Sequence, residues 1–107
     1  MERVGFLLKV KTARLDEYKQ IHKAVWPELL EIMRRAGWRN YSLFLSEDGW
    51  LFGYFETPDF ARALAELEKT DASKRWETMM APFFEDFGDR RGHDAGFVRL
   101  EEVFHLD

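Results

Sequence analysis

Residues 3–11 alternate in polarity at the start of the chain. Val4, Phe6, Leu8 and Val10 fall on one face of an extended backbone. An apolar period of two residues is typical of a strand that buries one face. The pattern therefore predicts a first strand over residues 3–11.

A helical spacing follows over residues 15–36. Its apolar stripe is formed by Leu15, Tyr18, His22, Val25, Leu29, Ile32 or Met33, and Ala36. This three-and-four spacing predicts an amphipathic helix, and Gly37 supplies its C-terminal stop. Pro27 removes the backbone bond that would reach the carbonyl of Lys23, so we expect a kink or a break near Trp26.

Two β-rich runs come next, over residues 38–45 and 50–56. They are separated by Ser-Glu-Asp-Gly at residues 46–49. Such a tetrapeptide forms a tight turn, so the two runs are predicted to form a hairpin.

Two helix starts follow the hairpin. Thr57 is expected to cap the first, with Pro58 in its first turn and Asp59 complementing its dipole. Thr70 and Asp71 offer the cap of the second. The apolar faces are Phe60, Ala63, Leu64 and Leu67 in the first helix, and Ala72, Trp76, Met79, Met80 and Phe83 in the second.

Residues 84–96 are rich in glycine and charge and predict an exposed loop, and residues 97–106 predict a last strand. The resulting order is strand, helix, strand, strand, helices, strand, which is the split βαβ, ferredoxin-like plan of the α+β class. Its helices cover only one face of an antiparallel sheet. Phe52 and Tyr54 oppose Leu51 and Phe55 in one strand, so both faces are apolar, and the uncovered face is expected to meet a second subunit.

Composition supports one compact domain over residues 1–107. Hydrophobic residues make up 46% of the 107 positions, with ten Phe and four Trp, which is enough for a core and an interface. The net charge is −4, with acidic and basic residues interspersed, so we expect no nucleic-acid partner. No cysteine is present, and no apolar run is long enough for a signal or membrane segment, so we expect a cytoplasmic protein without a membrane partner.

The predicted helix over residues 15–36 carries the first candidate chemistry. Tyr18 and His22 interrupt its apolar stripe four residues apart, so they stack on one face with their polar tips toward the sheet. A buried histidine of this kind is often a core residue bonded to tyrosine or backbone. The same pair is also typical of an active site, and the bend expected at Pro27 would make room for a cavity beside it.

Four further positions are candidate site residues. Tyr41, beside Asn40, alternates along the second strand, where most tyrosines only pack. Trp76 lies on an apolar helix face, where it fills the core or offers a platform for the C–H face of a sugar. His93 and His105 have no ligand spacing to His22, so no metal site is predicted.

The stretch YKQIHKAVWPEL at residues 18–29 resembles the helix signature of the L-rhamnose mutarotase family. Four more motifs resemble family motifs in order and spacing: Asn40-Tyr41, Leu51-Phe52, Thr70-Asp71 followed by Arg75-Trp76, and Glu102-Val103-Phe104. The likeness spans nearly the whole chain.

The resemblance implies a homodimeric, ferredoxin-like α/β barrel that equilibrates the α and β anomers of L-rhamnose, or a related 6-deoxyhexose, without a cofactor. The family's proton donor matches His22, and its sugar-binding positions match Tyr18, Tyr41 and Trp76. Glu77 stands where the family usually shows a second consecutive tryptophan. This difference affects which sugar the site is expected to bind. Mutarotation needs only acid–base catalysis, which histidine can supply, and the complementary group is open between Tyr18, Glu77 and a bound water.

Two other functions fit the predicted fold. One is a non-catalytic, dimeric ligand-binding or stress-response barrel, in which the pocket residues have no chemical role. The other is a cofactor-free monooxygenase on a similar barrel, but no residue of the sequence specifically supports that function. The motif at residues 18–29 favours the mutarotase.

Overall fold

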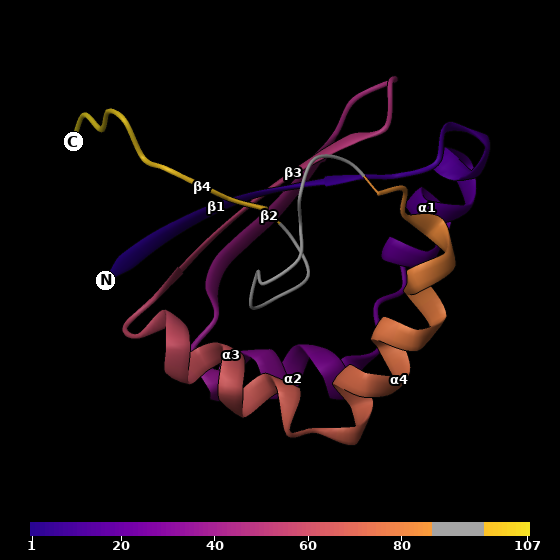
Figure 1. The fold of residues 1–107 in the computed structure, drawn as a ribbon. Helices are drawn as coiled ribbons and strands as arrows, with labels where there is room; N and C mark the ends of the chain where they lie inside the picture. Colours follow the sequence, from indigo (N-terminus) through magenta and orange to yellow (C-terminus); the bar gives the residue numbers. More distant parts are fainter. Residues whose placement is uncertain (87–97) are drawn as a thin grey trace.

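The computed structural model describes residues 1–86 and 98–107, and in this part of the chain four strands form one antiparallel sheet. The strands are β1 (Glu2–Lys9), β2 (Arg39–Leu45), β3 (Trp50–Thr57) and β4 (Val98–Leu100). Their order in the sheet is β2-β3-β1-β4. The helices lie to one side of it (Figure 1). This arrangement confirms the predicted ferredoxin-like plan.

The predicted long helix is broken in two, as expected from Pro27. The first part is α1 (Leu15–His22), which follows the short helix η1 (Thr12–Arg14), and the second is α2 (Pro27–Ala36). Trp26, with φ −55° and ψ 127°, has the extended conformation that a following proline imposes. Gly37 ends α2 with φ 100°, as predicted.

The second pair of helices confirms one predicted cap and corrects the other. Thr70 caps α4 (Asp71–Met80) by accepting a hydrogen bond from the Ser73 amide. The cap of α3 (Phe60–Glu68) is Asp59, whose side chain accepts from the Arg62 amide. The prediction that Thr57 caps this helix is wrong. Thr57 is the last residue of β3 and is fully buried there, so the helix begins two residues later than predicted.

The inner face of the sheet and the helices enclose two packed clusters. One joins β1 and β3 to α2 and α3 around the fully buried Phe55. The other surrounds Val10, Tyr18 and Leu51 beneath α1 and α4, and the short helix η2 (Ala81–Phe83) closes it with Phe83. The site described below lies between these clusters.

The outer face of the sheet carries large apolar side chains that none of the helices in the described part of the chain covers. Phe44 is 61% exposed, and Trp50, Phe52 and Leu100 are each more than a third exposed. We call these four residues the outer apolar face. It matches the expectation of strands that are apolar on both sides.

The C-terminal end differs from the predicted strand over residues 97–106. β4 covers only Val98–Leu100, and residues 101–107, the C-terminal tail, form no regular secondary structure. Glu102 makes two 2.8 Å hydrogen bonds with the Arg3 guanidinium, after which the tail runs away from the sheet (Figure 1). Its apolar side chains therefore stay in solvent, and Phe104 is 78% exposed.

The predicted loop over residues 84–96 lies mostly outside the described residues. Its first residue contradicts the prediction, because Phe84 is half-buried and bridges to Val10. Within the described residues, no helix is long and apolar enough to cross a membrane.

Candidate active site

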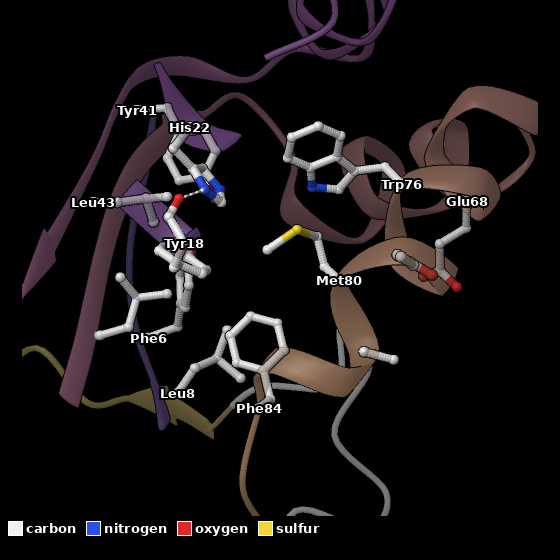
Figure 2. A pocket seen from close by; sticks show the side chains of 13 residues that line it. Phe6, Leu8, Tyr18, His22, Tyr41, Leu43, Glu68, Trp76, Met80 and Phe84 are labelled. Atoms are coloured by element: carbon white, nitrogen blue, oxygen red, sulfur yellow. Dashed lines mark hydrogen bonds between the residues drawn. The ribbon is translucent and has the colours of Figure 1, made fainter. Parts of the chain in front are cut away.

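A pocket of about 450 Å³ opens between the inner face of the sheet and helices α1 and α4. A second lobe of about 470 Å³ adjoins it toward α2 and α3. His22, Tyr41, Trp76 and Glu77 line both lobes, while Tyr18 lines the first. The structure thus brings all five predicted site residues to one cavity, and Figure 2 shows four of them around its opening.

Phe6 and Leu8 of β1 form the floor together with Leu43 of β2 (Figure 2). Phe6 pairs in register with Gly53 on β3, and a Cβ built at Gly53 would overlap the Phe6 ring. Only glycine lets the ring lie flat on the neighbouring strand. The depth of the pocket therefore depends on a residue that does not line it.

His22 is the last residue of α1 and faces the pocket. Its Nδ1 lies 3.0 Å from the carbonyl oxygen of Tyr18, and its ring stacks on the Tyr18 ring at 4.1 Å (Figure 2). Burial lowers the pKa of His22, and the backbone hydrogen bond opposes the shift. With Nδ1–H donating to the carbonyl, Nε2 of the neutral ring is left as a proton acceptor.

Tyr18 lies behind His22 and is 5% exposed. Phe83 and Phe84 meet its ring edge-on at 6.3 and 6.0 Å. Burial raises the pKa of the Tyr18 phenol, and the nearby Tyr41 adds to the shift. The phenol therefore stays protonated at neutral pH and remains a hydrogen-bond donor.

Tyr41 reaches the pocket through an irregularity in β2. The pairing with β3 shifts by one residue between Arg39 and Ser42, and Asn40 has φ 51°. Such a bulge reverses the alternation of side chains. Trp38 and Tyr41, which would otherwise point to opposite faces, have ring centres 5.3 Å apart.

The ring of Tyr41 packs within a cluster of aromatic side chains. Phe55 and Phe6 lie 5.7 and 6.3 Å away, centre to centre. Although 39% of the residue remains exposed, desolvation raises the pKa of its phenol. Tyr41 is therefore a second protonated phenol on the pocket wall.

Trp76 of α4 faces His22 across the opening (Figure 2). Its ring meets the imidazole edge-on at 5.5 Å and Trp26 edge-on at 5.1 Å. Arg75 bonds Asp71 at 2.7 Å and lies 5.4 Å from the Trp26 ring. The indole is held from two sides and offers an apolar platform to a ligand.

Glu77 follows Trp76 on α4. Although Glu77 is exposed overall, partial desolvation raises the pKa of its carboxyl, and the charge of Glu68, which also lines the first lobe, raises it further. Sequence reasoning did not single out Glu68. No sequence signal identifies it, because it reaches the pocket only through the packing of α3 against α4.

No cluster of metal-ligating side chains exists among residues 1–86 and 98–107. His105 lies in the C-terminal tail, 2.9 Å from the Asp107 carboxylate, and His93 is outside the described residues. What the pocket does contain is an uncharged imidazole, two protonated phenols, two carboxylates and an indole. Such a set is suited to proton transfer on a neutral, partly apolar ligand.

Comparisons of the sequence with known proteins all point to one family. A family profile described as L-rhamnose mutarotase matches residues 3–106. L-rhamnose mutarotases of Shouchella clausii and Burkholderia ambifaria are 37% identical over 109 residues and 35% identical over 108 residues. The alignments cover 99% of both chains in the first case and 100% in the second.

Solved structures agree. The crystal structure of an L-rhamnose mutarotase from Formosa agariphila covers 100% of both chains with a TM-score of 0.78 and 27% identity. An antibiotic biosynthesis monooxygenase has a TM-score of 0.63 at 22% identity, covering 96% of this chain and 99% of the other. The second likeness concerns the fold alone.

Proposed function

Because the chain belongs to the L-rhamnose mutarotase family, we propose that it is an enzyme that interconverts the α and β anomers of L-rhamnose or a related 6-deoxyhexose. His22 is the principal proton-transfer group. One observation carries the proposal: the imidazole is neutral, fixed through Nδ1 to the Tyr18 carbonyl, and placed in a pocket with Nε2 as its remaining proton acceptor.

The reaction requires two coordinated proton transfers. When the pyranose opens, the anomeric hydroxyl loses a proton and the ring oxygen gains one. Closure on the other face of the resulting carbonyl gives the other anomer. Neutral His22 accepts the proton of the anomeric hydroxyl and returns it on closure, a role that typically contributes roughly 10²- to 10⁴-fold in rate.

The complementary transfer needs an acid near the ring oxygen. The Tyr18 phenol is a candidate because it stays protonated at neutral pH and can donate a hydrogen bond to that oxygen, but its raised pKa makes it a weak acid. Glu77 and a bound water are the alternatives. Trp76 and Tyr41 bind the sugar, with the indole stacking on its C–H face.

We further propose that the protein is a homodimer. The outer apolar face is uncovered in one chain, and the C-terminal tail extends from it with Val103, Phe104 and Leu106 in solvent. Burying such surfaces is the main driving force of association. A second copy would cover both.

Saturation-transfer NMR on L-rhamnose tests the proposed activity directly, because the two anomers give separate signals. The expected result is a rate of exchange that rises in proportion to protein concentration. Sugar that raises the melting temperature without any faster exchange would instead support the non-catalytic barrel.

A further inference from the structure

Trp26 contacts the Trp76 indole without lining the pocket. It lies at the break between α1 and α2 and borders neither lobe. Its ring centre is 5.1 Å from that of Trp76, with 88° between the two ring planes. The side chain is half-buried and packs against the core cluster around Phe55. Trp26 can therefore influence a ligand only through Trp76.

His22 and Trp26 both meet the Trp76 indole edge-on. The angles between the ring planes are 85° for His22 and 88° for Trp26. Edge-on contacts favour one relative orientation of two rings, because the positive edge of one faces the negative face of the other. The sequence neighbours of Trp76 on α4, Arg75 and Glu77, are exposed, and the indole lies at the opening of the pocket (Figure 2). Loss of the Trp26 ring would leave the indole freer to turn toward solvent.

The position of Trp26 is itself fixed by its backbone and by its ring. Pro27 imposes the extended conformation of Trp26 at the start of α2. The Arg75 guanidinium lies 5.4 Å from the centre of the Trp26 ring, within the range of a cation–π contact. Arg75 in turn bonds Asp71 at 2.7 Å and Glu28 at 3.3 Å. Trp26 is thus a defined support for the indole of Trp76.

We propose that Trp26 is a positioning residue for the sugar, which raises the affinity of the site by holding the Trp76 indole in the orientation that stacks on the ligand. The inference rests on the proposed function, because it concerns how the same site binds its sugar. An indole that is already in place need not be ordered when the sugar arrives, so less of the binding free energy is lost to ordering. Proton transfer remains with His22, which Tyr18 holds by stacking and through its carbonyl oxygen.

Trp26→Leu tests this role, because it keeps an apolar side chain and removes the ring. The dissociation constant of L-rhamnose is measured by NMR titration, and kcat and KM are measured by saturation-transfer NMR. The dissociation constant and KM should rise about three- to tenfold, the usual cost of ordering one side chain on binding, while kcat should stay within about twofold of the native value. A merely structural role would lower the melting temperature and leave the dissociation constant of the folded fraction unchanged.

Three further variants make the result specific. Trp26→Phe keeps an aromatic ring and should restore most of the affinity that Trp26→Leu loses. Phe60→Leu is the matched control, since Phe60 is buried in the core cluster around Phe55 and lines neither lobe. It should lower the melting temperature without changing the dissociation constant. Trp26→Met, which has a flexible apolar side chain and no ring, replaces the leucine variant if that variant does not fold.

The possible failures are distinguishable. If the native protein exchanges L-rhamnose and Trp26→Leu binds it with the native dissociation constant, Trp26 only packs and the proposed function stands. A fall in kcat at an unchanged dissociation constant would also overturn the inference, because Trp26 would then act on His22 rather than on the indole. If the native protein binds L-rhamnose without exchanging its anomers, the proposed activity fails while the dissociation constants still decide the role of Trp26. If it does not bind the sugar, both fail.

Discussion

Tyr18 positions the imidazole of His22 through two separate contacts. The two rings stack at 4.1 Å with 24° between their planes, and the Tyr18 carbonyl oxygen lies 3.0 Å from Nδ1. The stacking sets the plane of the imidazole, and the hydrogen bond sets its tautomer. The four-residue spacing on one helix is what allows a single residue to make both contacts.

Replacing His22 tests the proposed proton transfer. His22→Asn keeps a polar side chain of similar size but removes the group that titrates near neutrality, so exchange of L-rhamnose anomers should fall about 10²-fold or more. His105→Asn, in the exposed tail, is the matched control and should exchange at the native rate. A folded, sugar-binding His22→Asn protein with near-native exchange would return His22 to a purely structural role.

The pH dependence follows from the lowered pKa of His22. Desolvation favours the neutral ring, so the active base persists below the ordinary pKa of 6.5, and exchange should decline only under more acidic conditions. The unfolded chain binds this proton more tightly, so the stability that His22 contributes is present above about pH 6.5 and is lost as the pH falls. An NMR titration of the His22 ring gives the pKa, and a value above 6.5 would contradict the burial argument.

The contact between Phe6 and Gly53 predicts that a substitution at Gly53 alters the pocket, although Gly53 does not line it. Gly53→Ala should push the Phe6 ring into the pocket, weaken sugar binding, and lower the free energy of unfolding by about 1–3 kcal/mol, as overpacking does. Gly5→Ala is the control, because its Cβ would lie 3.5 Å from Phe52 in ordinary contact on the outer face. Chemical denaturation and a sugar titration measure the two effects, and equal behaviour of both variants would refute the explanation.

The outer apolar face predicts the oligomeric state. Sedimentation or light scattering at micromolar concentration should give about twice the monomer mass. Phe44→Asp places a charge on this face and should shift the protein toward the monomer without unfolding it, since the residue is 61% exposed in one chain. A native protein that sediments as a monomer would remove the basis of this prediction.

Local patterns in the sequence predicted much of the fold. The alternation in β1, the helical stripe with its break at Pro27, and the cap at Thr70 each depend on a few neighbouring residues, and all are confirmed. The stacking of Tyr18 on His22 follows from the same helical period. Features that depend on contacts between residues far apart in the sequence were harder to predict.

Three features show why the remainder was not predictable. The pairing of Phe6 with Gly53 depends on the register between β1 and β3, which the spacing within either strand does not reveal. Thr57 was expected to cap a helix because its residue type is suited to that role, but the burial of β3 extends to it. The last strand was predicted too long because the residues after Leu100 are apolar enough for a strand, yet among the described residues of this segment only Val98–Leu100 pair with β1.

The bulge at Asn40 also bears on how this strand tolerates change. Asn40 and Ser42 are exposed, so substitutions there should often be accepted as long as residue 40 can adopt a positive φ. A deletion or insertion of one residue between Arg39 and Ser42 is a different matter, because it would place Trp38 and Tyr41 on opposite faces of the sheet. In this segment, chain length is therefore under stronger constraint than amino-acid identity.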